Sequence, residues 1–244
     1  MVSLFNNLIF EPLLSLLVWI YNTLSFGDLG MAIIILTFFI RLILLPLFFK
    51  SSKDQTLVRK LQPEVDKIKQ KHKKDKTEQG QALMDLYKKY KVNPFSGFLL
   101  LIIQLPIFIA LFKIFRDPDL IIQTFEKFTF LGIVNLTEVS ITLVIIAAAV
   151  QYFQGKISLG SVNKNQPQNK ANPMAKIGNS MIYIGPILSF IILTRLPSAL
   201  AVYWITSALC SVAQQIVINK KISAEPLGNK ISTPSMISNE EKSK

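Results

Sequence analysis

The amino-acid sequence predicts an all-α membrane protein: five transmembrane helices, an amphipathic interfacial helix before them, and a cytoplasmic antiparallel helical hairpin between the first and second spans. Three observations predict this fold class. Hydrophobic residues make up 50% of the 244 residues and charged residues only 17%, whereas a soluble domain carries about 25% charged residues. The hydrophobic residues lie in five long blocks. The basic residues lie mainly in three of the polar segments around these blocks.

Each of the five apolar blocks is predicted to cross the membrane as a helix. A span needs about 20 mostly apolar residues, and a helix satisfies its own backbone hydrogen bonds in lipid. The last two blocks are separated by a short turn that contains Pro197, so we expect them to form a tight pair. The single cysteine, Cys210, lies in the last block, which excludes an intrachain disulfide.

Residues 1–28 are predicted to form a helix that lies in the outer membrane interface. Leucine and isoleucine side chains recur near one helical face, while Asn7, Glu11 and Asn22 lie largely off it. An apolar stripe with a polar face is typical of an interfacial helix. The segment lacks the basic start and the small-residue cleavage site of a signal peptide. A sixth span is the alternative, which the Glu11-Pro12 pair disfavours.

Basic residues predict which side of the membrane each segment faces. Residues 50–92 carry 13 Lys and Arg against 6 Asp and Glu, and residues 155–176 carry four Lys and no acid. The tail from residue 219 carries five bases against three acids. Residues 1–28 hold two acids and no base, and residues 116–138 hold two bases and four acids. Because Lys and Arg are enriched in cytoplasmic loops, we expect the amino terminus outside and the carboxyl terminus in the cytoplasm.

The predicted order of segments follows from these assignments. It is the interfacial helix 1–28, first span 29–50, hairpin 51–93, second span 94–115, outer loop 116–137, third span 138–155, cytoplasmic loop 156–176, fourth span 177–193, outer turn 194–197, fifth span 198–218 and cytoplasmic tail 219–244.

The hairpin is polar, yet apolar side chains recur in it at three- and four-residue spacing, as in two short helices. Pro63 suits the start of one helix, and Asp75 with Glu78 suits a capping box at the start of the other. We interpret the hairpin as a basic arm that meets anionic lipid headgroups, ribosomal RNA or an incoming chain. The alternative is a solvated loop whose lysines only fix the topology. The only histidine, His72, lies among lysines, so no metal site is predicted.

Arg41 is a charge inside the first span, about eight residues from its cytoplasmic end. Placing such a charge in the bilayer costs about 3 kcal/mol on insertion scales. None of the five apolar blocks contains Asp or Glu, so no ion pair within the chain is available at that depth. We therefore expect polar side chains and water around Arg41.

Several side chains in other spans are candidates for a groove around Arg41. If they converge on one face, they line a hydrated cavity between helices; the alternative is that each only bonds a neighbouring helix. The candidate groove residues are Arg41, Thr37, Gln104, Gln151, Tyr203 and Trp204.

The same residues separate three functional classes. A fixed cation in a half-open groove suits transient binding of a polar or acidic peptide. A small-solute transporter or a lipid scramblase is the alternative, although a coupled transporter typically uses intramembrane acids or internal repeats. An enzyme is disfavoured, because no histidine lies within a span and no serine has an apparent base. No catalytic residue and no cofactor is predicted.

The chain resembles the YidC/Oxa/Alb family of membrane protein insertases from residue 10 to about residue 220. The resemblance rests on several segments in the same order, including GDLGMAIIILTFFIRLILLPL, LQPEVDKIKQKHKKD and LPSALAVYWITSALCSVAQQ. It implies a five-helix core and a groove that is open to cytoplasm and lipid but closed outside. In that groove Arg41 and Thr37 match the arginine and threonine of the first core helix, and Tyr203 and Trp204 match the aromatic pair of the last.

The resemblance also implies a function and partners. A nascent span would place its polar flank in the groove, and its apolar segment would leave along the first, third and fifth spans into lipid. The implied partners are nascent membrane proteins and the lipid bilayer, with the Sec translocon and the ribosome as further candidates and no other nucleic-acid function. Without a transit-like leader, the expected location is a bacterial inner membrane. The sequence departs from the family at Asn93-Pro-Phe-Ser and at Pro197-Ser-Ala, and neither departure touches the predicted groove.

Overall fold

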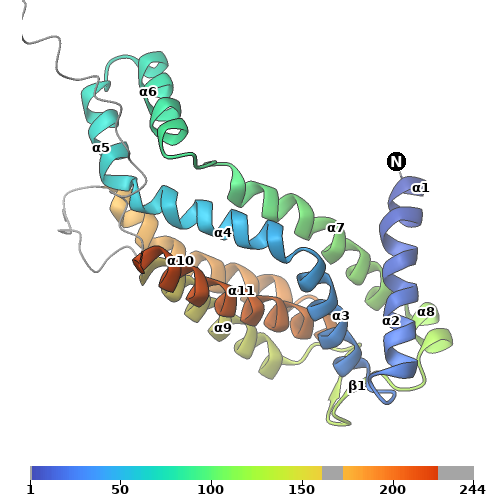
Figure 1. Cartoon of the computed structure of the whole chain (residues 1–244). Helices are drawn as coiled ribbons and strands as arrows, with labels where there is room; N and C mark the ends of the chain where they lie inside the picture. The colour runs from blue at the N-terminus through green and yellow to red at the C-terminus, as the bar shows by residue number, and fades with distance from the viewer. Residues whose placement is uncertain (1, 161–172, 225–244) are drawn as a thin grey trace, which may run out of the picture.

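A computed structural model describes residues 2–160 and 173–224 of the chain, and these residues are almost entirely helical (Figure 1). Four helices are long and apolar enough to cross a membrane, or five if one bent pair counts as a single span. This confirms the all-α membrane class. The elements are α1 (Val2–Phe5), η1 (Asn6–Phe10), α2 (Glu11–Thr23), α3 (Leu29–Ile43), α4 (Leu45–Lys60), α5 (Gln62–Lys71), α6 (Lys76–Lys89), α7 (Ser96–Arg116), α8 (Pro118–Thr124), β1 (Thr129–Phe130), β2 (Val134–Asn135), α9 (Ile141–Gly160), α10 (Pro173–Leu193) and α11 (Ser198–Ala224).

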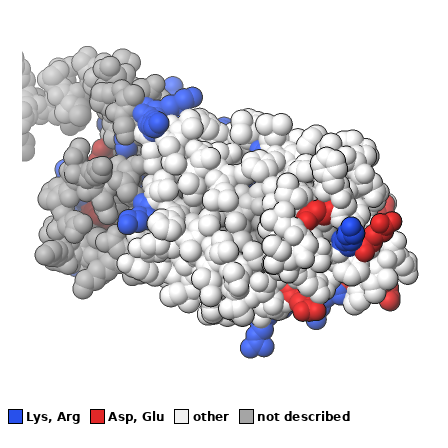
Figure 2. All heavy atoms as spheres, turned by 90° about the horizontal axis from the view of Figure 1, so that it is seen from below, with Lys and Arg blue, Asp and Glu red and all other residues white. Residues whose placement is uncertain are grey.

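The long helices lie side by side and the short elements gather at the two ends of this bundle (Figure 1). Helix α11 contacts α9, α3, α4 and α7. Helices α5 and α6 project from one end, while α2, α8 and the small antiparallel sheet lie at the other. Figure 2 shows an uncharged band across one face, with charged side chains toward its ends. We call the end with α5 and α6 the hairpin end, and the opposite one the sheet end.

The segment predicted as one straight first span consists of two helices. Helix α3 ends at Ile43, α4 begins at Leu45, and the two are bent by 72° at the break. Pro46 stands in the first turn of α4, where its missing N–H breaks no helical bond. Helix α4 then continues to Lys60, ten residues beyond the predicted end at 50, so only the part after Leu61 forms separate short helices.

The N-terminal segment is one continuous helical stretch with a π-helical turn at Asn6–Phe10. This turn immediately precedes Glu11-Pro12. A proline ring clashes with the carbonyl four residues earlier in a regular α-helix, and a π turn relieves that clash. Residues Ser3–Thr23 are long and apolar enough for a span. Its interfacial position therefore stays a prediction.

The remaining boundaries shift by a few residues. Helix α9 reaches Gly160, beyond the predicted end of the third span, and residues 161–172 of the predicted cytoplasmic loop lie outside the described residues. Helix α10 has 21 residues and begins at Pro173, four residues before the predicted start of the fourth span at 177, and its stretch Ile182–Leu193 is apolar. Helix α11 extends to Ala224, and the rest of the predicted tail lies outside the described residues.

Buried side chains change from apolar to polar along the bundle. Near the sheet end, α3, α7, α9 and α11 contribute buried apolar residues such as Leu36, Leu111 and Leu200 to one core. Further toward the hairpin end, from the residue after Leu36 to about four turns beyond Leu200, the same helices carry polar side chains. Thr37, Arg41, Thr206, Ser207 and Gln215 are buried, and Gln104 and Gln151 are half-buried. The sheet end of the bundle is therefore closed by apolar packing, and the polar side chains lie behind that closure.

Candidate functional site

Arg41 lies in the last turn of α3, just before the bend. Asp28 caps the start of this helix, and its carboxylate accepts a hydrogen bond from the Met31 amide at 2.8 Å. Because the chain bends at Leu44, the guanidinium contacts a side chain of α4 as well as one of α11. Its Cζ lies 4.2 Å from the centroid of the Phe48 ring, which α4 supplies, and a cation over an aromatic face is attracted by the ring's quadrupole.

One side of the Arg41 guanidinium is anchored to α11. Its Nη2 donates to the carbonyl oxygen of Ser207 at 2.8 Å and to the Ser207 hydroxyl at 2.5 Å. The residue is only 8% exposed. Its other terminal nitrogen, Nη1, is buried and has no hydrogen-bond partner among the described residues. We call Arg41, Phe48 and Ser207 the Arg41 site.

The other predicted groove residues form separate polar contacts, two of which also end on α11. Gln104 of α7 donates to the Tyr203 hydroxyl. The Trp204 indole Nε1 donates to Gln151 Oε1 of α9 at 3.2 Å. Tyr203 stands four residues before Ser207 on the same face of α11, so the first contact lies about one turn from the Arg41 site. Helix α11 thus receives polar side chains from α3, α7 and α9 within about one turn.

Thr37 is buried one turn before Arg41, as predicted from the sequence, but its hydroxyl donates to the Ile33 carbonyl of its own helix at 2.6 Å. This is the ordinary way in which a helix satisfies a buried threonine. This hydrogen bond gives Thr37 no direct part in holding Arg41.

Sequence reasoning missed Phe48 and Ser207. The signal for Phe48 was Pro46, because a proline three residues after Ile43 suggests a new helix start rather than a straight span. Ser207 stands four residues after Tyr203, on the same helical face. That spacing could have added it to the candidates, but it does not identify a partner 166 residues away in the chain.

A second polar cluster joins α4 to α9 and α11 closer to the hairpin end. Gln215 Nε2 donates to the Thr56 hydroxyl at 2.9 Å and to Asn219 Oδ1 at 2.8 Å. Arg59 Nη1 donates to the carbonyl and hydroxyl of Ser158 at 3.0 and 2.7 Å. These bonds hold α4 against the bundle past the predicted end of the first span.

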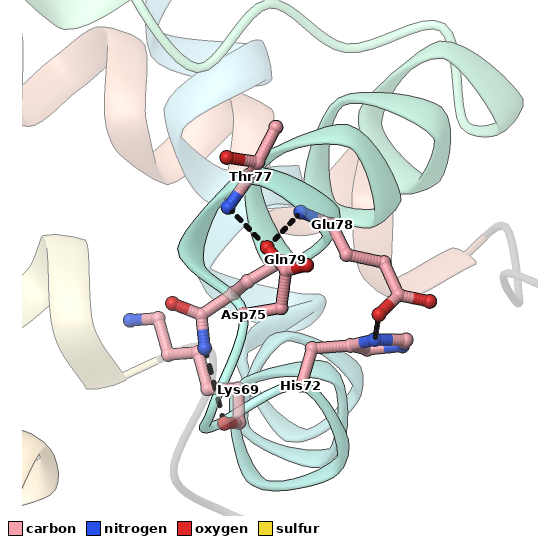
Figure 3. Close-up of polar contacts among 6 residues, drawn as sticks. All are labelled: Lys69, His72, Asp75, Thr77, Glu78 and Gln79. Carbon is pink, nitrogen blue, oxygen red and sulfur yellow. Dashed lines mark hydrogen bonds and ion pairs between the residues drawn. The ribbon is translucent and has the colours of Figure 1, made fainter.

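The turn between α5 and α6 is held by local polar contacts (Figure 3). Asp75 caps α6 by accepting from the Thr77 and Glu78 amides at 2.8 and 3.0 Å. The Glu78 carboxylate contacts His72 Nδ1 at 3.0 Å. Among the described residues it accepts no hydrogen bond from the Asp75 amide, which a capping box requires. Gln79 donates to the Lys69 carbonyl at 3.0 Å. Within residues 2–160 and 173–224, no three His, Cys, Asp or Glu side chains are grouped to hold a metal.

The chain is similar over most of its length to proteins of one family. The family model described as 60Kd inner membrane protein matches residues 19–225. The membrane protein insertase YidC of Fusobacterium nucleatum is 37% identical over 215 residues, which cover 87% of this chain and 98% of that protein. The protein of the same name from Clostridium tetani is 36% identical over 201 residues, covering 82% and 86%. Membrane protein insertase YidC 2 of Staphylococcus epidermidis is 35% identical over 222 residues, covering 86% and 73%.

Proposed function

This chain belongs to the 60Kd inner membrane protein family, and we propose that it is a membrane protein insertase of a bacterial inner membrane. Three relatives that it matches over most of their own length carry the insertase name. Its several apolar helices suit a multi-pass membrane protein. Its substrates would be nascent membrane proteins, received alone or with the Sec translocon, and a ribosome would meet the basic hairpin.

The observation that carries the mechanism is the half-anchored Arg41. Ser207 and Phe48 fix one side of the guanidinium, and Nη1 keeps a buried donor without a partner among the described residues. A buried donor left unsatisfied costs about 1–3 kcal/mol. A carbonyl or carboxylate in the polar flank of an incoming span, or water that accompanies it, would remove that cost. The Arg41 site is therefore suited to bind a polar peptide transiently.

The distribution of buried residues supports a direction for the proposed groove. Apolar packing closes the sheet end, where residues such as Leu36 and Leu200 are fully buried, and polar side chains begin behind it. The excess of Lys and Arg in residues 50–92 supports a topology with the hairpin end in the cytoplasm and with both the sheet end and the amino terminus outside. A polar flank that enters from the cytoplasm would thus reach Arg41, and the outer closure would keep the membrane sealed.

Release of the substrate needs no catalytic group in this mechanism. The apolar segment of a nascent span gains about 0.8 kcal/mol for each buried CH₂ when it moves from water into lipid. That gain exceeds the transient hydrogen bonds at Arg41, so the segment would leave sideways between the spans. We accordingly propose that the protein acts without a cofactor and is not an enzyme.

Depletion and rescue tests this function. In bacterial cells depleted of their own insertase, expression of this chain should restore membrane insertion of a small protein that spans the membrane twice. The Arg116→Ala variant is a matched control, because it removes an exposed guanidinium at the outer end of α7. Failure of the unmodified chain to restore insertion of any substrate, together with lipid flipping or solute flux by the purified protein in vesicles, would instead favour a scramblase or transporter.

A further inference from the structure

We propose that the sheet end carries a rigid apolar tip, formed by Phe26, Leu131 and Ile133, that inserts into the outer-leaflet lipid at the boundary of headgroups and acyl chains. The inference rests on the proposed topology, which places the sheet end outside. It concerns how the protein itself is positioned in the bilayer, and neither the Arg41 site nor the proposed route of a substrate requires it.

The three side chains of the apolar tip are among the most exposed apolar groups of the molecule. Phe26 is 99% exposed, Ile133 is 83% exposed and Leu131 is 61% exposed. They come from two separate turns, one between α2 and α3 and one between β1 and β2. Neither turn belongs to an apolar span, so ordinary exposure of a transmembrane helix to lipid does not account for them.

Both turns place a bulky residue in a backbone conformation that usually belongs to glycine. Phe26 and Leu131 each have a φ of 53°, and each is followed by a glycine with positive φ, Gly27 at 75° and Gly132 at 68°. A non-glycine residue in this region is uncommon and strained. The two turns thus share one backbone conformation, in which an exposed apolar residue with positive φ is followed by a glycine with positive φ.

Polar bonds join the two turns into one unit. The Asp28 carboxylate accepts from the Leu131 amide at 2.6 Å, and through its other oxygen it caps α3. The Tyr21 hydroxyl accepts from the Lys127 amide at 2.9 Å. The Phe130 ring lies so close to α3 that a Cβ on Gly30 would overlap it. The apolar tip is therefore fixed to α2 and α3.

Two features identify lipid as the occupant. Phe26 of the apolar tip follows shortly after the end of α2. Near that end Trp19 is 52% and Leu24 is 45% exposed, and tryptophan is enriched at membrane interfaces. The outer segment 116–138 also carries four acids and two bases. That balance suits the zwitterionic or uncharged part of a lipid surface and disfavours anionic headgroups.

Quenching by lipid tests this placement in the full-length protein. The Phe26→Trp substitution is made in a Trp19→Phe, Trp204→Phe background and reconstituted in nanodiscs of phosphatidylcholine with brominated acyl chains. Compared with unbrominated lipid, we expect at least about a twofold loss of tryptophan emission, because an interfacial indole contacts the acyl chains. The Lys74→Trp variant in the same background is the control, since Lys74 lies in the exposed hairpin turn, and its emission should not change.

Cysteine labelling keeps the proposal testable if the tryptophan variant does not fold. In a Cys210→Ala background, a charged maleimide should label Ile133→Cys in nanodiscs at least about tenfold more slowly than Lys74→Cys, because lipid excludes the reagent. Unquenched emission, or labelling as fast as at Lys74, would overturn the proposal and would point to a soluble outer partner. Both measurements need no substrate, so their outcome is independent of the insertase function.

Discussion

The Arg41 site and the turn of the α5–α6 hairpin use the same kinds of polar contact in opposite surroundings. At the hairpin turn, the Glu78 side chain that contacts His72 is 61% exposed, so water can also solvate its carboxylate. At the Arg41 site the residue is 8% exposed, and Nη1 has no hydrogen-bond partner in the part of the chain that the structure describes. An exposed ion pair contributes about 0–1 kcal/mol, whereas a buried group without its partner is destabilising by more than that. The same kind of contact therefore adds little free energy in the hairpin, whereas at the Arg41 site it leaves a buried donor unsatisfied.

The largest expected effect is on function at Arg41. The Arg41→Ala variant should lower insertion of substrates with acidic outer tails at least about tenfold, because it removes a charge-assisted bond of about 1.5–3 kcal/mol. Arg41→Lys should largely preserve insertion, since the charge stays. An insertion assay in cells, with His72→Ala as the hairpin counterpart, measures both. Equal insertion of every substrate by Arg41→Ala would remove the functional difference between the two regions.

Two glycines extend the comparison to packing. Gly30→Ala should destabilise the protein by about 1–3 kcal/mol, because its Cβ would overlap the Phe130 ring. Gly80→Ala in α6 should stabilise by about 0.5–1 kcal/mol, because nothing lies within 4 Å and alanine favours helix. Unfolding followed by circular dichroism in detergent gives both changes. Equal effects of the same sign would show that the packing of Phe130 against Gly30 at the sheet end is not tight.

Two glutamines compare one bond type in the two regions. Gln215 is buried and donates to Thr56 and Asn219, so Gln215→Ala should cost about 1–3 kcal/mol. Gln79 is only partly buried at the hairpin and donates to the Lys69 carbonyl. Gln79→Ala should therefore cost less than about 1 kcal/mol. Denaturant titration of each variant in the same micelles measures the difference, and a larger loss at Gln79 would contradict the assignment of α4 to the bundle.

The smallest expected effect is at Tyr90, whose hydroxyl donates to Glu64 at 2.8 Å and joins the two hairpin helices. Burial raises the pKa of Tyr90 above its usual value of 10.0, and the hydrogen bond to Glu64 raises it further. The folded hairpin thus holds this proton more tightly than the unfolded chain. Its stabilising effect is complete below pH 10 and is lost as the pH rises through the higher folded pKa.

Tyr90→Phe removes this effect. We expect it to lower hairpin stability by less than about 1 kcal/mol at neutral pH, and to make the loss of stability above pH 10 shallower. Hydrogen exchange of the α5 and α6 amides between neutral and alkaline pH measures both. An unchanged alkaline profile would mean that the bond contributes nothing in water. Tyr87 is the comparison, because burial raises its pKa as well but no hydrogen bond to Glu64 contributes.

The sequence was sufficient where one physical rule decides the outcome. Long apolar blocks predicted the spans, because a segment in lipid must satisfy its own backbone hydrogen bonds, and a helix does so. The absence of an acid in those blocks predicted that Arg41 would rely on neutral partners, and it bonds to Ser207 and lies over Phe48. Asp75 was predicted to start a helix, and it caps α6.

Prediction failed where the outcome depends on distant packing. Ser207 resembles any serine in a span until α3 and α11 are placed together, and a serine hydroxyl can equally bond its own helix. The bend at Leu44 needed Pro46 to be interpreted as a helix start within an unbroken apolar block. The sheet of β1 and β2 has two residues in each strand, too few to show a period of two.

Photo-crosslinking to an arrested nascent span tests the central claim most directly, namely that the surroundings of Arg41 on α11 receive the substrate. A crosslinking amino acid replaces Trp204, which contacts Gln151, or Leu209, which is 51% exposed on the same helix. We predict an adduct of the polar flank at position 204 that is lost when Arg41 is changed to Ala. Adducts confined to position 209, or an adduct at 204 that persists without the guanidinium, would contradict the account.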